Sequence, residues 1–454
     1  MQGLLSTGGR RIYPVNPNAA EVHGIKAYRS VVDIPDSIDL VVIVVNAQLV
    51  PEVLRQCVSK EIKAAIIISS GFAETNEHGQ ELEEELAKVA REGGISVIGP
   101  NSMGHADTRS KLSTFGMPRD MTPGPVALLS QSGGTCLKIV SGCMEYGITF
   151  STYISTGNES NLRTEDYLEY LAQDDDTRII AAYIEGLRDG RRFFQLAKEI
   201  TVRKPIVVVK VGGTEESARA VRSHTAALAG ADAVYTAAFK QSGVIRANDD
   251  DELCDVVYSL LNSPLPKGNR IGILSIGGGQ GALTTEVCEK EGLTIGQLEP
   301  STVKKLDKYL PSRWSRRNPV DMAGPSFSDF SKTAELLSPL LEDSNTDVIF
   351  VLAPIAIDVA RLASRMGFNA EEVKSYEERE EMNIKLIGEK IEKYGKPVVL
   401  MEHYRNISGN PKLAALFRRE KILVLPSAHR AARVMRHLAW YRQYLNNVGG
   451  QVIS

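Results

Sequence analysis

Short runs of apolar, mostly β-branched residues alternate with longer amphipathic stretches along the chain. The apolar runs include residues 40–45, 64–69, 126–130, 205–213, 271–275 and 348–354. Amphipathic stretches such as PEVLRQCVSKE and QELEEELAKVAREGG lie between them. Continuous apolar strands separated by helices are typical of parallel sheets that are covered on both faces. The pattern therefore predicts an α/β protein built from doubly wound parallel sheets.

Two segments rich in proline and glycine interrupt this alternation. FGMPRDMTPGPV spans residues 115–126 and NSPLPKGNR spans residues 262–270, and each leads into a new apolar strand. Clusters of this composition mark turns and linkers, and 454 residues are enough for about three domains of ordinary size. We therefore expect domains at residues 1–122, 123–265 and 266–454.

Two glycine-rich turns follow apolar strands in the second and third expected domains, SQSGG from residue 130 and GGGQG from residue 277. Such a turn exposes backbone N–H groups at a helix N-terminus, where an anion is favoured. Neither is a Walker A motif, since no GK[ST] follows, and neither is a clean GxGxxG fingerprint. Each turn alone is more often ordinary turn chemistry, but their repetition in successive domains favours phosphate binding.

The bulk composition argues against several classes of protein. The 53 Lys and Arg nearly balance the 56 Asp and Glu, so no global field favours nucleic acid or an anionic membrane. The apolar run LVVIVV is far too short to span a bilayer, and the N-terminus lacks the features of a signal peptide. The five cysteines have no CxxC spacing, which argues against disulfides and zinc. We expect a cytoplasmic protein with no resident metal.

One histidine stands among small residues in SHTAALAG, residues 223–230. No second His or Cys lies nearby to share a metal with His224, and from composition alone a structural or surface histidine is the better interpretation. Lys210, after PIVVV, could contact a phosphate or simply end a strand. The expected strand RRIYPVN ends without the Asp or Glu that an NAD-binding domain uses for ribose, which disfavours a nicotinamide dehydrogenase.

Taken together, these loops resemble the α subunits of the ADP-forming acyl-CoA synthetases, relatives of succinyl-CoA synthetase. The matching segments run in the family's order over almost the whole chain. They are YPVNPN, DLVVIVV, ISSGFAE, VIGPNSMG, LLSQSGG, STGNES, YIEGLRDGR, SHTAALAG, DAVYTAAFKQSGVIR, LPKGNRIGILSIGGGQG and NPVDM. A resemblance carried by so many motifs is far more specific than any single loop.

The resemblance implies a Rossmann-like CoA-binding domain followed by two flavodoxin-like succinyl-CoA-ligase domains. The family's reaction converts acyl-CoA, ADP and phosphate into carboxylate, CoA and ATP, through an acyl phosphate and then a phosphohistidine. The implied cofactors are CoA, phosphate, and ATP or ADP with Mg²⁺ bound on a separate subunit. The implied partner is an ATP-grasp β subunit in an α2β2 heterotetramer.

The resemblance also assigns roles to individual residues. His224 is similar to the phosphorylated histidine, and Glu185 in YIEG is similar to the carboxylate that orients the imidazole. One phosphate-holding helix start matches Ser130, Ser132 and Gly133, and the other matches Gly278, Gly279 and Gly281. The CoA-binding edge matches Tyr13, Val15, Pro17, Val45, Gly71, Pro100 and Asn101.

The chain departs from the family pattern at both ends. The family's first strand and its Gly-Ala-Ser loop are expected before YPVNP, and here Met1 falls inside what should be the first helix. No ATP-grasp segment follows residue 454, so we expect nucleotide to bind on the β subunit. These departures motivate one alternative function, a non-catalytic CoA- or acyl-CoA-binding regulatory or scaffold module.

Overall fold

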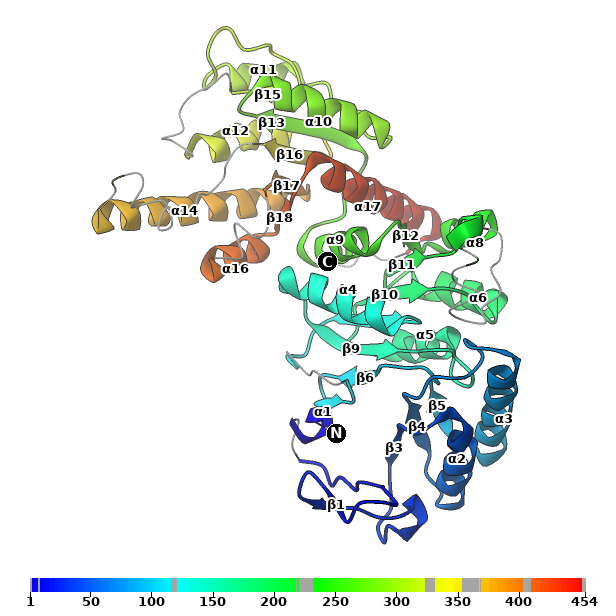
Figure 1. Ribbon diagram of the computed structural model, residues 1–454. Helices are drawn as coiled ribbons and strands as arrows, with labels where there is room; N and C mark the ends of the chain where they lie inside the picture. Colours follow the sequence, from blue (N-terminus) through cyan, green and yellow to red (C-terminus); the bar gives the residue numbers. More distant parts are fainter. Residues whose placement is uncertain are drawn as a thin grey trace. The chain divides into compact units, whose positions relative to one another are not determined.

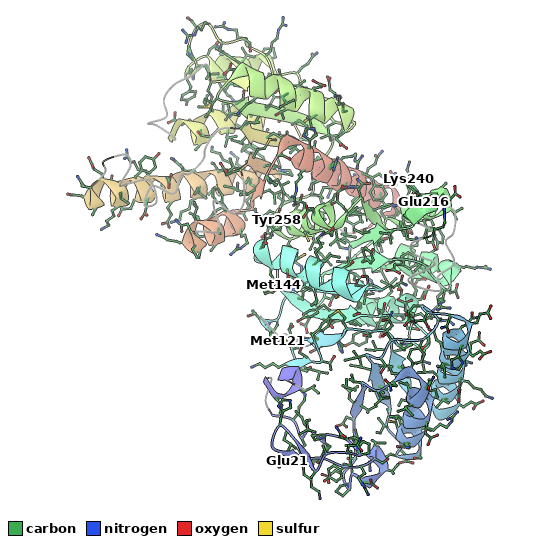
Figure 2. All side chains as sticks on the ribbon, viewed as in Figure 1. Glu21, Met121, Met144, Glu216, Lys240 and Tyr258 are labelled. Atoms are coloured by element: carbon green, nitrogen blue, oxygen red, sulfur yellow. The ribbon has the colours of Figure 1, made fainter. Side chains whose placement is uncertain are left out.

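The computed structural model describes residues 2–6, 9–115, 121–217, 219, 232–322, 331–352, 367, 369–402 and 410–450 (Figure 1). The chain divides into two compact units, residues 1–253 and 254–454. In each unit the side chains fill the space between strands and helices (Figure 2). The finer three-domain division, with boundaries at residues 122 and 265, stays a prediction.

The first sheet of unit 1 is small and entirely parallel. Its strands run in the order β3 (Leu40–Ile43), β4 (Ala64–Ile67) and β5 (Ser96–Ile98). The apolar faces of α2 (Val50–Ser59) and α3 (Glu77–Gly93) pack on this sheet and on each other. The short elements of this region are α1 (Gln2–Ser6), β1 (Glu21–Val22), β2 (Ile25–Lys26), η1 (Val31–Asp33) and η2 (Ala47–Leu49).

The segment RRIYPVN does not form the strand that its apolar residues predict. Only Val15 makes an isolated bridge, with Tyr28, and the backbone pairs there through the carbonyl of Pro14 and the N–H of Asn16. The physical reason lies in the prolines: Pro14 and Pro17 have no N–H to donate, so a continuous ladder cannot form here.

A seven-stranded sheet forms the rest of unit 1, in the order β12-β11-β10-β8-β9-β6-β7. Its first five strands are parallel, and β6 pairs antiparallel with β9. The strands are β6 (Gly104–Asp107), β7 (Leu112–Ser113), β8 (Val126–Ser130), β9 (Phe150–Ser155), β10 (Ile179–Ile184), β11 (Ile206–Lys210) and β12 (Ile245–Ala247). The helices are α4 (Gly133–Glu145), α5 (Thr164–Gln173), α6 (Gly190–Ile200) and α8 (Asp232–Ser242), and α9 (Asp250–Asn262) crosses the boundary between the two units at residue 253. The hairpin β6–β7 therefore belongs to this sheet although it precedes residue 122.

Unit 2 contains a six-stranded parallel sheet. Its order is β14-β13-β16-β17-β18, and β15 pairs with β13. The strands are β13 (Arg270–Ser275), β14 (Thr294–Ile295), β15 (Val320–Asp321), β16 (Val348–Leu352), β17 (Val398–Met401) and β18 (Ile422–Leu425). The helices are α10 (Gly278–Lys290), α11 (Pro300–Leu306), α12 (Ser331–Glu342), α14 (Ala370–Tyr394), α16 (Pro411–Arg419) and α17 (Ala428–Val448). None of the helices in the described ranges combines the length and apolar character that a membrane crossing requires.

The two sheets of unit 1 meet where the turn after β9 packs on the turn after β5. Backbone N–H groups of Asn158 and Ser160 donate to the carbonyls of Pro100 and Gly99, at 2.9 and 3.2 Å. Gly157, which directly precedes Asn158, has φ +63°, and a Cβ there would come within 2.2 Å of the carbonyl oxygen of Pro100. The approach is backbone against backbone, so only glycine fits at residue 157.

Replacing Gly157 with Ala should lower the free energy of unfolding by about 2 kcal/mol or more, because the Cβ both collides with a carbonyl and requires a left-handed backbone. Thermal and chemical denaturation measure the loss. Gly190→Ala is the matched control: it sits at the start of α6 with open space around the added Cβ. A Gly157→Ala chain as stable as Gly190→Ala would contradict the proposed close approach.

Candidate active site

The strand end that carries Glu185 is fixed by two side chains from neighbouring strands. Glu185 directly follows β10 and is only 5% exposed. Its N–H donates to Oε1 of Gln131 at 2.6 Å, and its carbonyl accepts from Nζ of Lys210 at 2.9 Å. Gln131 also holds Gly186, accepting from its N–H at 3.0 Å and donating to its carbonyl at 2.8 Å. The backbone at Glu185 is therefore locked before any ligand binds.

Gln131 was not among the site residues that the sequence indicated, although it lies inside SQSGG between two that were. Its role depends on Glu185 and Gly186, which follow it by more than fifty residues. The available signal was chemical: Gln131 is the one amide in that turn, and an amide can accept and donate at once.

Lys210 ends β11 and is buried, with 7% exposure. Besides the carbonyl of Glu185, its Nζ contacts the carbonyl of Val211 and lies 4.4 Å from the ring centroid of Tyr235. Burial, together with the charge of Arg246, lowers the pKa of Lys210 to about 8. The sequence left open whether Lys210 contacts a phosphate or ends a strand. Its described contacts are with backbone carbonyls and an aromatic ring, as expected of a residue that ends a strand.

The first glycine-rich turn forms the start of α4. Ser132 is the N-cap and accepts from the N–H and the hydroxyl of Thr135, at 3.4 and 3.0 Å. Ser130 is buried, and its hydroxyl donates to the carbonyl of Ser132 at 2.6 Å. A Cβ at Gly133 would collide with the side chain of Met103, whereas Gly134 faces open space. The turn thus presents the first N–H groups of a 13-residue helix, which have no partners within the helix.

The second glycine-rich turn forms the start of α10 in unit 2. Its N-cap, Gly277, makes no side-chain capping bond, and Gly279 has open space where a Cβ would point. Gly278 lies near Oδ2 of Asp321, and Gly281 is buried against Pro319. Gly278, Gly279 and Gly281 therefore lie at a helix N-terminus. As the sequence predicts, α10 repeats the arrangement at α4, in which a glycine-rich turn connects a strand to a helix.

The carboxyl ends of β3, β4 and β5 bring four of the expected CoA-binding residues to one edge. Ser69 connects two of them: its Oγ accepts from the N–H of Val45 at 3.0 Å, and its carbonyl accepts from the N–H of Asn101 at 2.8 Å. Gly71 follows with φ +105°, and Pro100 precedes Asn101 in the turn after β5. Val45 is 38% exposed, so apolar surface remains open at this edge.

A pocket of about 360 Å³ opens beside this edge, between the loop after β3 and the start of α3. Gly71 contributes to its wall, together with Asn46, Gln48, Asn76 and His78. Its lining is mostly polar, and the N-terminus of α3, where an anion is favoured, lies at Asn76.

The remaining three CoA candidates lie in the segment that fails to form a strand. Tyr13 packs on the core of the first sheet, and its hydroxyl donates to Asp36 in a short hydrogen bond that raises the pKa of Tyr13. Val15 and Pro17 are exposed. No described contact joins these three to Val45, Gly71 or Asn101.

His224 lies outside the described residues, but the described chain on both sides of it reaches the Glu185 edge. On one side, Lys210 bonds to Glu185 and leads into residues 211–217. On the other, α8 begins at Asp232, which pairs with Arg246 of β12. A Cβ at Gly213 would lie 2.8 Å from Oδ1 of Asp232, so the two ends of the intervening segment meet beside Glu185.

Known proteins resemble this chain in sequence. A family model described as a CoA binding domain matches residues 1–107, and one described as a succinyl-CoA ligase like flavodoxin domain matches residues 123–260. The α subunit of ADP-forming acetate–CoA ligase II from Pyrococcus furiosus is 41% identical over 348 residues, 76% of this chain and 75% of the relative. The α subunit of ligase I from the same organism is 43% identical over 331 residues, 71% of each chain.

A solved structure is similar over nearly the whole chain. It is the dinucleotide-forming acetyl-coenzyme A synthetase 1 of Ca. Korarchaeum cryptofilum in complex with phosphate and ADP. The match has a TM-score of 0.79 and 30% identity and covers 98% of this chain and 93% of the other.

The sheets and the matches define a protein with a CoA-binding domain followed by a succinyl-CoA-ligase-like flavodoxin domain. The chain belongs to the family of the α subunits of ADP-forming acetate–CoA ligases. The family resemblance and the α/β fold class that the sequence predicts are both confirmed. The relatives are named as α subunits, which implies a β-subunit partner.

Gln131→Ala should loosen the backbone at Glu185, because it removes the one side-chain oxygen that accepts from the N–H groups of both Glu185 and Gly186, and also the donor to the Gly186 carbonyl. Leaving buried backbone groups unpaired costs about 1–3 kcal/mol each. We expect amide hydrogen exchange at residues 185–186 to quicken by roughly tenfold or more. Mass spectrometry measures it, with β16 in unit 2 as the internal reference. Unchanged exchange at residues 185–186 would contradict this role for Gln131.

Lys210→Met should change the pH dependence of stability in a defined direction. Because burial lowers the pKa of Lys210 from 10.5 to about 8, the folded chain binds fewer protons than the unfolded chain between these values. The stability of the wild type relative to Lys210→Met should therefore rise with pH from 8 to 10.5, by at most about 1.4 kcal/mol per pH unit. Below pH 8 the difference should be constant. Chemical denaturation at several pH values measures it.

The matched substitution is Lys240→Met, which removes an exposed lysine from α8 (Figure 2). The stability of the wild type relative to Lys210→Met could instead fall as the pH rises from 8 to 10.5. That result would contradict a lowered pKa for the buried Lys210.

Proposed function

We propose that this chain is the CoA-binding, phosphohistidine-bearing subunit of an ADP-forming acyl-CoA synthetase. In the proposed cycle, phosphate attacks the acyl carbon of acyl-CoA and releases CoA as the thiol, which leaves an acyl phosphate. The neutral imidazole of His224 then attacks the phosphorus, and the carboxylate leaves. The phosphoryl group finally passes from His224 to ADP and forms ATP. The relatives' names make acetate the first acid to test.

Each group of site residues has a part in this cycle. The loops at Val45, Gly71, Pro100 and Asn101 bind CoA at the carboxyl edge of the first sheet. Glu185 accepts a hydrogen bond from one imidazole nitrogen, so that the other is free to act as nucleophile. The helix starts at Ser130, Ser132 and Gly133 and at Gly278, Gly279 and Gly281 stabilise phosphoryl groups through backbone N–H groups and the helix dipole. Tyr13, Val15 and Pro17 complete the CoA edge.

The observation that carries the proposal is the placement of both ends of the histidine segment. Gly213 and Asp232 come together at the strand edge where Glu185 is held. His224 lies between them and is eight residues from Asp232. Eight extended residues span at most about 28 Å, which sets an upper limit on the distance between His224 and Asp232.

The proposed partner is an ATP-grasp β subunit, which supplies the site for ADP or ATP with Mg²⁺ in an α2β2 heterotetramer. The α-subunit names of the relatives and the ADP and phosphate bound in the similar solved structure support this assignment. The alternative of a non-catalytic acyl-CoA-binding module predicts CoA binding without turnover with any β subunit. It is disfavoured, because the residues that would be needless in such a module, Glu185 and the two helix starts, are all in place.

Labelling identifies the phosphorylated residue. The chain and its β subunit are incubated with ATP that carries a labelled γ-phosphate, and acid-labile protein label is counted. We expect His224→Ala to abolish the label and Glu185→Gln to reduce the rate of labelling by roughly 10²- to 10⁴-fold. His429→Ala removes an exposed histidine of α17 and is the matched control, with wild-type labelling expected. Acid-labile label that survives in His224→Ala would falsify the phosphohistidine proposal.

A further inference from the structure

Asn158 stands in the turn after β9, in the second sheet of unit 1, but its side chain bonds entirely to the CoA-binding region. Its Nδ2 donates to Oε2 of Glu74 at 2.6 Å and to Oε2 of Glu83 at 2.8 Å. Its Oδ1 accepts from Nδ2 of Asn101 at 3.2 Å. The residue is 6% exposed, so water does not replace these bonds.

The partners of Asn158 belong to the two loops expected to bind CoA. Glu74 accepts from the N–H groups of Gly71 and Phe72, at 2.6 and 3.2 Å, and so closes the loop after β4 around its own carboxylate. Asn101 is in the turn after β5 with φ +57°, a backbone conformation that a free loop would seldom hold. One amide therefore holds the shape of both loops.

The third partner extends the same contact to the Glu185 loop. Glu83 is a buried residue of α3, and burial raises the pKa of its carboxyl. It accepts from the N–H of Ala73 at 3.3 Å and pairs with the guanidinium of Arg188 at 3.4 Å. Arg188 also donates to the carbonyl of Asn158 at 3.1 Å and follows Glu185 by three residues. Two carboxylates are thus bridged by one amide and partly balanced by one cation.

We propose that Asn158 is a positioning residue that presets the CoA-binding loops at Gly71 and Asn101 and ties them, through Glu83 and Arg188, to the loop of Glu185. The inference rests on the proposed function, because it assumes that these loops bind CoA. The physical reason is geometric: an amide can donate two hydrogen bonds and accept another, and at Asn158 all three are used between loops of two different sheets. Neither Asp nor Ala can reproduce this set.

The test measures KM for CoA and kcat separately, in the complex with the β subunit, together with calorimetric titration of the chain with CoA. We expect Asn158→Ala to raise KM and the Kd for CoA by about 10- to 100-fold, because it removes hydrogen bonds to charged groups. The change in kcat should be smaller. Asn161→Ala is the matched control. Asn161 lies in the same segment and accepts from the N–H of Val97 at 2.9 Å, away from both loops.

A second pair of substitutions, which exchanges an amide and a carboxylate between residues 158 and 83, shows whether the effect comes from a lost positioning role or from a chain that fails to fold. Asn158→Asp faces Glu74 and Glu83 with a third carboxylate and should raise KM for CoA more than Asn158→Ala does. Adding Glu83→Gln returns an amide donor to the pair and restores the net charge, so the double variant should recover a large part of the loss. Glu84→Gln in the same background removes an equal charge from the exposed side of α3 and should recover none.

The outcomes distinguish this inference from the function on which it rests. If the wild-type chain binds no CoA, the proposed function fails. If the wild type binds CoA but Asn158→Ala binds it equally well, or if Asn161→Ala raises KM as much, the role of Asn158 is overturned. Equal recovery by Glu83→Gln and Glu84→Gln would also overturn it, because general charge relief would then explain the effect.

Discussion

The backbone contact between the turns at residues 99–101 and 156–160 is the constraint on which the site depends. The N–H groups of Asn158 and Ser160 donate to carbonyls of the other turn, and Gly157 leaves no room for a side chain between them. This contact sets the carboxyl edge of the first sheet against that of the second. The proposed CoA-binding edge and Glu185 therefore share one compact unit, and neither has to be brought to the other by a rearrangement of sheets.

Around this contact, amide and charged side chains form hydrogen bonds with backbone groups that follow the ends of strands, where strand pairing no longer supplies partners. Gln131 and Lys210 bond to the backbone of Glu185, and Glu74 bonds to the backbone of Gly71. Buried backbone groups need partners, and partners supplied by side chains fix a loop without adding another strand. The strand edge is thus rigid while its outer surface, including Val45, remains open to a ligand.

Local sequence patterns predicted the elements of this site well and its connections poorly. Apolar runs predicted β3, β8, β11 and β13, and glycine-rich turns predicted the starts of α4 and α10, because these features depend on residues close together in the chain. RRIYPVN was the wrong prediction: its apolar residues suit a strand, but Pro14 and the following Pro17 remove backbone donors. Gln131 and Asn158 were missed as positioning residues because their partners lie about fifty or more residues away, and hydrogen-bonding capacity leaves no periodic signal.

The proposed chemistry explains why the segment SHTAALAG contains only one histidine. A metal site would need several ligands gathered around His224, whereas phosphoryl transfer needs one imidazole, one acceptor for its second nitrogen, and donors for the phosphate oxygens. The backbone at Glu185 is held by side-chain hydrogen bonds, and the helix that starts after Ser132 presents N–H groups that have no partner within the helix. Gly213 and Asp232, which flank the segment of His224 in the sequence, come together in the same unit as Glu185. One histidine between these two residues is therefore enough for the proposed phosphoryl transfer, and a cluster of metal ligands is not required.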